Sequence, residues 1–277
     1  MKNSEKHILS VGHAVFAATM TALGVLALRE GNLAPVWAPL PKGVPARGLV
    51  VDLCALVCLG SGLGLFWPRT AIVAARVLLA WFLLWSLLFN LPTAFPAPTV
   101  LGSWYGCAEI AVTTAGTWVL YTWFATEWDK RWFGFATGDK GVRIARILYG
   151  LALIFFGLGH FAYIEPTVAL VPNWLPAHLF WAYFTGGAFV AGGLAVLIGV
   201  WAKLAAALMA LQIGLFIPLI WLPLVATGQI SAFRWGEFVA TCALTAGAWV
   251  MADSYRIIPG RGGTSATGLL HARGQRT

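Results

Sequence analysis

Charged residues are scarce in this sequence, and the scarcity limits the class of protein that it can encode. Asp, Glu, Lys and Arg make up 10% of the 277 residues, whereas hydrophobic residues make up 60%. A soluble domain carries about 25% charged residues. The chain therefore cannot be an ordinary soluble globule unless something other than its own core covers most of its apolar surface.

Metal-binding motifs and nucleic-acid signals are also missing. The four cysteines form no C-x-x-C pair and no Cys/His spacing typical of zinc, so we expect no metal site and no disulfide framework. The net charge of +8 comes from basic residues that lie between apolar runs, without an aromatic-interleaved basic patch. This distribution argues against nucleic-acid binding and suits basic residues that set membrane topology.

Long apolar runs are what the chain does have. A bilayer core about 30 Å thick needs about 20 mostly apolar residues per helix. The runs are continuous rather than alternating, which disfavours transmembrane strands. We predict an all-α integral membrane protein with eight transmembrane helices. The eight runs are Ile8–Leu28, Gly48–Phe66, Thr70–Leu91, Trp104–Phe124, Ile147–Tyr163, His178–Val200, Leu204–Leu224 and Gly236–Ala252.

The first run follows a short basic start, as the apolar region of a signal peptide would. It is long for such a region, and no convincing small-residue cleavage site follows it. We therefore interpret Ile8–Leu28 as a retained transmembrane helix.

The positions of Lys and Arg predict the orientation of the helices. If the N-terminus is cytoplasmic, 14 of the 18 basic residues fall on the cytoplasmic side. The four on the outer side are Arg29, Lys42, Arg47 and Arg234. This bias favours a multi-pass protein of the inner (plasma) membrane with both termini in the cytoplasm, and it supports an even number of helices.

The two halves of the chain share a pattern of residues. Identical residues recur at one constant spacing early in the chain, and at a slightly shorter one after an insertion around Lys42–Pro45. The matches are Gly24/Gly159, Ala27/Ala162, Glu30/Glu165, Val36/Val171 and Pro41/Pro176 at the first spacing, and Ala46/Ala177, Gly62/Gly193, Pro92/Pro223, and Ala115-Gly116-Thr117-Trp118 with Ala246-Gly247-Ala248-Trp249 at the second. Since each half holds four helices, both halves have the same orientation, as in a parallel repeat.

These spacings predict the domain organisation. We expect two four-helix bundles, in residues 1–125 and 143–255, related by that parallel repeat. A charged cytoplasmic linker, residues 126–142, joins them. Residues 256–277 form a basic, Gly- and Ser-rich tail that we expect to be disordered.

Ionisable residues gather near the predicted outer ends of the helices. They are Glu30, Arg47, Asp52 and Glu109 in the first half and His160, Glu165, His178 and Glu237 in the second. Such residues in membrane helices are costly and are candidates for function by default. We expect two related polar pockets, or one shared pocket, that open outward. In the repeat, Glu109 and Glu237 align about one helical turn off the neighbouring match.

Within this group we assign catalytic roles to His160, Glu237 and Glu165. His160 could relay a proton or bind a ligand, and its position in the first half is Val25. The predicted ligand-binding residues are His178, Tyr183, Trp174, Asp52 and Glu109. The alternative is that the charged residues lie in interfacial water and that tryptophans such as Trp174 form an aromatic belt.

Three cysteines form a further candidate site, for redox chemistry. Cys54 and Cys58 are four residues apart on one helix face, and Cys107 enters its helix from the same side of the membrane. Cys54 and Cys58 are poorly placed to bond each other on one helix, so a disulfide would need Cys107. The alternative is that all three are small apolar fillers.

A family resemblance appears in residues 143–255. Gly159-His160-Phe161, Pro172-x-Trp174-Leu175-Pro176, Tyr183-x-Thr185-Gly186, Gly192-Gly193 and the acid Glu237 follow this order in the second half. This half resembles the DoxX/DoxD-like family of four-helix membrane proteins, and the first half looks like a diverged copy. The resemblance implies a four-helix bundle per unit. Some members are subunits of a thiosulfate:quinone oxidoreductase, which implies a quinone and a partner subunit.

Three functions follow as hypotheses. The first is a membrane subunit in redox or quinone-linked sulfur-compound metabolism, with an oxidoreductase partner because the loops are too short to form an enzyme domain. The second is a transporter of a small solute or lipid. The third is a non-catalytic assembly partner. A lack of Gly- or Pro-broken helices at matching positions argues mildly against the transporter.

Overall fold

The computed structural model describes residues 8–32, 40, 43–228 and 230–256. These residues form helices joined by short connections, and no strand occurs among them. Six helical spans in this part of the chain are long and apolar enough to cross a membrane. They are Val11–Glu30, Arg47–Leu65, Pro68–Ala94, Gly138–Ala162, His178–Ile198 and Ala202–Ala226. The all-helical class and the membrane environment are therefore as predicted.

The first half of the chain contributes α1 to α5. Ser10 caps α1 by accepting a hydrogen bond from the His13 amide, and Pro68 starts α3 at a position that needs no amide donor. A π-helical segment interrupts the third long helix. The elements are α1 (Val11–Glu30), α2 (Arg47–Leu65), α3 (Pro68–Trp85), the π segment η2 (Ser86–Asn90), α4 (Leu91–Ala94), the 3₁₀ turn η3 (Leu101–Trp104) and α5 (Tyr105–Phe124).

The second half follows the same order after a short amphipathic helix. That helix, α6 (Glu127–Trp132), begins with a capping box between Thr126 and Asp129. The remaining elements are α7 (Gly138–Ala162), the short α8 (Ile164–Val168), α9 (His178–Ile198), α10 (Ala202–Phe216), the π segment η4 (Ile217–Trp221), α11 (Leu222–Ala226) and α12 (Ala232–Asp253).

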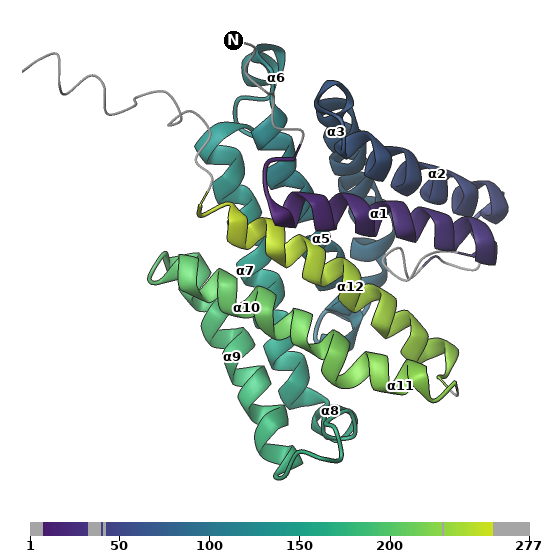
Figure 1. Cartoon of the computed structure of the whole chain (residues 1–277), viewed down its shortest axis with the longest axis vertical. Coiled ribbons are helices and arrows are strands. Elements are labelled where there is room, and N and C mark those ends of the chain that lie inside the picture. Colours follow the sequence, from purple (N-terminus) through teal and green to yellow (C-terminus); the bar gives the residue numbers. More distant parts are fainter. Residues whose placement is uncertain (1–7, 33–39, 41–42, 229, 257–277) are drawn as a thin grey trace, which may run out of the picture.

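The helices pack as a closed circuit with two central members. Going round, α1, α2, α3, α5, α7, α9, α10 and α12 each contact the next, and α12 returns to α1. The helices α5 and α12 also contact each other, so they separate the α1–α3 group from the α7–α10 group (Figure 1). The α1–α3 group and the α7–α10 group thus meet along α5 and α12, with α1 packed against α12 and α7 mainly against α5.

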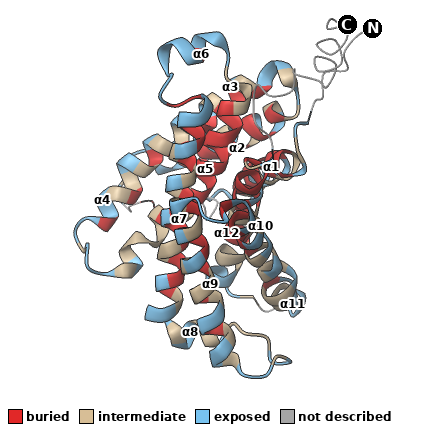
Figure 2. Ribbon diagram, turned by 90° about the vertical axis from the view of Figure 1, so that its left-hand side faces the viewer, coloured by how far each residue is buried: buried red, intermediate tan, exposed pale blue. Residues whose placement is uncertain are grey.

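The two central helices are more polar and more buried than their neighbours. Buried residues run the length of α5, and the red segments gather along α5, α1 and α12 (Figure 2). Their threonine hydroxyls donate to carbonyls one turn earlier in the same helix, as Thr117 does to Thr113 and Thr245 to Thr241. Because other helices cover them, α5 and α12 need less apolar surface than the six spans named above.

Glycine allows α5 and α12 to approach closely. A Cβ atom on Gly116 of α5 would lie 2.9 Å from the Cα atom of Gly247 in α12. Real Cβ atoms do not come this close, so a side chain at Gly116 would push the helices apart. Small residues at such crossings are typical of membrane helix packing.

Several irregular features recur in both halves at the second spacing of the repeat. The π segments begin at Ser86 and Ile217, and each is followed by a proline, Pro92 or Pro223. Ala46 and Ala177, just before α2 and α9, both have left-handed backbone angles, with φ of 51° and 56°. Non-glycine residues adopt this conformation rarely.

The structure differs from the sequence-based boundaries in the connections. Residues 126–142, predicted as a linker, contain α6 and the first turn of α7, which starts at Gly138 rather than at the predicted Ile147. The third and seventh runs continue past their π segments to Ala94 and Ala226. The predicted insertion at Lys42–Pro45 is described only in part, and Val36, Trp37, Pro41, the first seven residues and the tail from 257 lie outside the described residues.

Candidate functional site: a carboxylate pair on the central helices

Two acidic side chains interact near the outer ends of α5 and α12. We call the end of the bundle where α1 begins and α12 ends the inner end, and the opposite one the outer end. Glu109 lies in the second turn of α5 and Glu237 in the second turn of α12. The two carboxylates are close enough to repel each other electrostatically, and both residues are half-buried. We call them the carboxylate pair.

A tyrosine one turn before Glu109 joins this group. Tyr105 interacts electrostatically with Glu109, with Glu237 and with Tyr163, which directly follows α7. Its hydroxyl packs directly on Gly159 of α7, where any side chain would collide with it. Tyr105 therefore links the carboxylate pair to α7.

Tyr163 is fixed by a hydrogen bond at the start of α5. Its hydroxyl accepts a hydrogen bond from the Gly102 amide at 3.1 Å, and its ring centroid lies 6.0 Å from that of Tyr105. Sequence analysis did not select either tyrosine. The i, i+4 spacing of Tyr105 and Glu109 was the available signal, because it places both on one helix face.

No positive charge balances the carboxylate pair among the described residues. Within the described residues, neither carboxylate forms an ion pair or a hydrogen bond through its side chain. Of the basic residues predicted on this side of the membrane, Arg47 donates to the Leu40 carbonyl. Arg234, one turn before Glu237 in α12, is exposed and has no ion pair among the described residues. Two neighbouring acids without a paired cation are a costly arrangement away from bulk water.

His160 lies beside this group but faces a different helix. Its Nδ1 atom is 2.8 Å from the Phe156 carbonyl, one turn earlier in α7. Its ring lies 5.2 Å from that of Phe189 in α9, and its Cβ atom packs against Gly186. The ring therefore lies between α7 and α9, whereas the neighbouring Gly159 faces Tyr105. The catalytic role of His160 stays a prediction.

The other predicted polar residues lie at the periphery. Glu165 is exposed on α8, Asp52 is exposed on α2, and His178 is half-buried as the first residue of α9. Trp174 is 68% exposed. Tyr183 stacks on Phe161, with ring centroids 6.0 Å apart. The fold does not gather these five residues around the carboxylate pair.

Cys107 lies at a different helix interface from Cys54 and Cys58. None of the four forms a disulfide bond. Cys54 and Cys58 are buried in the core of the first half, and Cys54 lies beside Trp81 of α3. Cys107 instead lines an apolar groove of about 130 Å³ between α5 and α7, with Trp104 and Phe155. The three thiols predicted as a redox site are thus not brought together.

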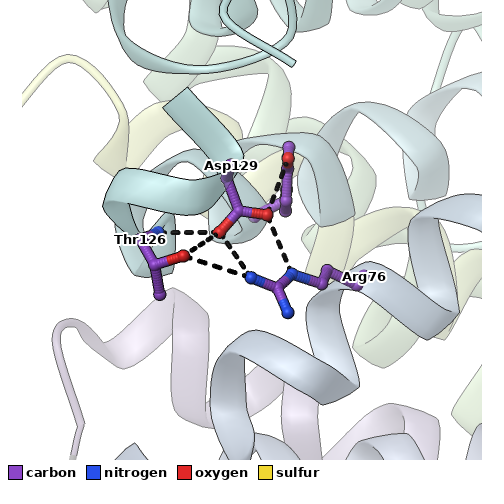
Figure 3. A network of polar contacts seen from close by, with 4 residues as sticks. Arg76, Thr126 and Asp129 are labelled. Atoms are coloured by element: carbon purple, nitrogen blue, oxygen red, sulfur yellow. Dashed lines mark hydrogen bonds and ion pairs between the residues drawn. The ribbon is translucent and has the colours of Figure 1, made fainter. Parts of the chain in front are cut away.

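At the inner end, a buried acid has a complete set of partners that sequence analysis missed. Asp129 of α6 accepts hydrogen bonds from Arg76 of α3 at 2.6 and 2.8 Å, from the Thr126 amide at 2.8 Å, and from the Tyr121 hydroxyl at 3.1 Å (Figure 3). Burial raises the pKa of Asp129, but hydrogen bonds from Arg76 and Thr126 outweigh it and hold the pKa well below the usual range. We call this the inner network.

A second buried histidine also has a structural explanation at the inner end. His13 Nδ1 accepts a hydrogen bond from the Leu9 amide, and Nε2 lies 2.9 Å from the Leu65 carbonyl at the end of α2. With Nδ1 as acceptor, Nε2 carries the proton and donates it to that carbonyl. His13 therefore joins α1 to α2 and is far along the bundle from His160.

Comparisons with known proteins do not assign a family. No family model, no curated protein and no solved structure matches this chain. Among the described residues, no group of three His, Cys, Asp or Glu side chains is placed to hold a metal ion. Among the described residues, the carboxylate pair is the group that best supports a chemical role.

Proposed function

We propose that this protein binds and exchanges a proton at Glu109 and Glu237, as a membrane subunit in quinone-linked redox metabolism. The carboxylate pair is the observation that carries the proposal. Two acids that repel each other away from bulk water favour the state in which one of them holds a proton. Tyr105 offers a hydroxyl to the same group and can donate a hydrogen bond to the ionised member.

The proposal includes eight transmembrane helices in two parallel four-helix units. The packing circuit supports it, because α5 and α12 occupy equivalent places and the π segments and left-handed alanines recur at one spacing. Burial supports the same register: Ala75 and Ala206 are both fully buried, as are Val119 and Val250. With the basic residues of α3, α6 and α7 on the cytoplasmic side, both termini lie inside and the carboxylate pair faces outward.

The redox part rests on the DoxX-like resemblance and on one structural feature. The groove lined by Trp104, Cys107 and Phe155 lies at the same end of α5 as Glu109, but on nearly the opposite face of the helix. Trp104 and Phe155 stack with ring centroids 6.1 Å apart. A groove of about 130 Å³ suits part of a quinone, such as its ring or the start of its tail. Quinone reduction takes up protons, which the carboxylate pair would supply. The connections are too short for an enzyme domain, so a partner oxidoreductase subunit is part of the proposal.

A proton-coupled transporter of a small solute or lipid is the second candidate, and one observation favours it. The sequence suggested no broken helices at matching positions, but η2 and η4 are irregular at matching positions and each is followed by a proline. Irregular helices in corresponding places of two repeats are a feature of transporters. A carboxylate pair at the contact between the halves would then couple proton binding to movement of one half against the other.

Infrared spectroscopy of the full chain in liposomes would test the proton site. The wild-type protein should show the C=O band of a protonated carboxyl at neutral pH, and the band should disappear in Glu109→Gln and in Glu237→Gln. Glu127→Gln, at the exposed end of α6, is the matched control because Glu127 lies far from the pair. A wild-type spectrum in which every carboxyl is ionised at neutral pH would overturn the proposal.

A second measurement separates the two candidates. Addition of a short-tailed ubiquinone analogue should shift the carboxyl band and quench tryptophan fluorescence if a quinone binds near Trp104. Substitution of Phe155 by Ala should weaken that quenching. Flux of a solute driven by a pH gradient, without any response to quinone, would instead favour the transporter.

A further inference from the structure

An open groove lies at the inner end of the second half, between α10 and α12. Its volume is about 470 Å³, and its walls are mainly apolar. It is lined by Trp201, Lys203, Leu204, Ala207, Ala252 and Arg256. We call it the inner groove. It lies at the opposite end of these helices from the carboxylate pair, so the proton site does not account for it.

In the first half, longer side chains occupy the corresponding corner. In the repeat register that relates the two π segments, Ala207 corresponds to Arg76 and Ala252 to Tyr121. Arg76 and Tyr121 are two members of the inner network and reach Asp129 of α6. In the second half, two alanines replace these long side chains, and the corner is open. The match of Ala207 with Arg76 and of Ala252 with Tyr121 depends on the proposed repeat. The groove and its lining residues are independent of it.

The basic side chains at the inner groove also lack an acidic partner like the one that the first half provides. In the first half, α6 supplies Asp129 as the anion for Arg76. At the inner groove, Lys203 is exposed and has no ion pair among the described residues. Arg256 is 3.9 Å from Asp253, and its side chain is 64% exposed.

Asp253 is already engaged elsewhere. Its Oδ2 atom accepts a hydrogen bond from the Gly12 amide in the first turn of α1 at 3.0 Å. The remaining nearby cation, Arg146, donates to the Ser254 carbonyl at 2.9 Å and lies over the Tyr255 ring. Lys203, and Arg256 with its long contact of 3.9 Å to Asp253, are therefore the basic groups that can bind an anion at the groove.

We propose that the inner groove binds one anionic phospholipid from the cytoplasmic leaflet. Lys203 and Arg256 would contact the phosphate, and Leu204, Ala207 and Ala252 would contact the start of an acyl chain. Trp201, which is 80% exposed, suits the interface between lipid headgroups and acyl chains. Basic pockets between helices on the cytoplasmic side have the chemistry to bind anionic headgroups. The lipid takes the place that Asp129 fills in the first half.

Native mass spectrometry of the full-length protein, with dioleoyl phosphatidylglycerol or dioleoyl phosphatidylcholine added to detergent micelles, would test this proposal. The wild-type protein should retain one phosphatidylglycerol in preference to phosphatidylcholine. Lys203→Gln with Arg256→Gln should weaken that retention by about 30-fold, since each basic residue near an anionic surface contributes about 1 kcal/mol. Lys140→Gln with Arg143→Gln, an exposed basic pair on α7, should leave it unchanged.

A steric variant separates lipid binding from general charge attraction. Ala207→Phe keeps both basic residues but fills the groove, so it should also lose the retained lipid. Equal retention by wild type and Ala207→Phe, or equal loss in the α7 control pair, would overturn the proposal. Binding of inorganic phosphate without lipid, or a dimer that forms in place of the lipid adduct, would overturn it as well. None of these outcomes depends on proton exchange at Glu109 and Glu237, so failure here leaves the proposed function unaffected.

Discussion

The two ends of this bundle treat buried acids in opposite ways. At the inner end, Asp129 has a bidentate arginine, a threonine and a tyrosine as partners. At the outer end, Glu109 and Glu237 have each other, and no cation among the described residues is paired with them. A satisfied acid stabilises a fold, whereas two unsatisfied acids reduce its stability. The difference indicates that the inner network holds the structure together and that the carboxylate pair is kept for its chemistry.

The largest effect is expected from Asp129→Asn. It removes the negative charge from a fully buried position and leaves Arg76 with a weakened set of hydrogen bonds. Breaking a buried pair costs about 3 kcal/mol, here at the low end because Arg76 is partly exposed. Thermal unfolding in detergent, followed by circular dichroism, measures it. Glu127→Gln, from an exposed pair with Lys130, should change stability by less than about 0.5 kcal/mol. An equal loss of stability in both variants would contradict a stabilising role of the inner network.

Gly116→Ala should have the next largest effect, and it tests whether the two ends are independent. The added Cβ atom would lie 2.9 Å from the Gly247 Cα atom, so α5 and α12 must separate at a cost of about 2 kcal/mol. The variant should shift the infrared band of the carboxylate pair but leave the contact of Arg76 with Trp128 unchanged. Gly60→Ala is the control, because nothing lies near that position. An unshifted band in Gly116→Ala would mean that the pair does not depend on this crossing.

Glu237→Gln should raise the free energy of unfolding, whereas most substitutions inside a protein lower it. The folded wild type must hold a proton on one carboxyl at neutral pH, which costs free energy, whereas Gln needs no proton. Stability should therefore rise by about 1 kcal/mol while proton exchange is lost. The measurement is thermal unfolding alongside the infrared titration. A loss of stability comparable to that of Asp129→Asn would show that Glu237 has a structural partner and would remove the contrast between the two ends.

The acid sensitivity of the inner network follows from the pKa of Asp129. Hydrogen bonds hold this pKa below the value of about 3.9 of an unfolded Asp. The stability that the carboxylate contributes is therefore fully present above about pH 4 and is lost as pH falls toward the folded-state pKa. Fluorescence of Trp128, which packs under the Arg76 guanidinium, should stay constant from pH 8 to about pH 5 and change only in stronger acid. A transition near neutral pH would contradict the assignment.

The sequence predicted the long elements well because each run is apolar enough to be recognised by itself. Its failures lie where the structure depends on distant contacts. The salt bridge between Arg76 and Asp129 joins residues 53 positions apart, and only the capping pattern of Thr126 and Asp129 was visible locally. The π segments have no composition that marks them, since Ser86–Asn90 and Ile217–Trp221 share almost no residues.

The site was predictable only in part for the same reason. Glu109 and Glu237 were both selected, but their proximity depends on the crossing of α5 with α12, which no single helix reveals. Tyr105 escaped notice because its role depends on Gly159, a residue of another helix. His160, by contrast, was chosen because it is a lone histidine in an apolar run. Its ring lies between α7 and α9 and contacts Phe189.

The smallest effect on the carboxylate pair is therefore expected from His160→Ala, and it decides whether the outer site extends beyond that pair. The ring contacts the Phe156 carbonyl and Phe189, so its loss should lower stability by about 1 to 2 kcal/mol through the α7–α9 contact. The carboxyl band and its pH titration should stay unchanged, because Tyr105 meets α7 at Gly159 rather than at His160. His160→Phe, which keeps an aromatic ring, should recover part of the stability. If either variant shifts the carboxyl titration, His160 exchanges protons with the pair, and the outer site reaches from α12 across α5 and α7 to α9.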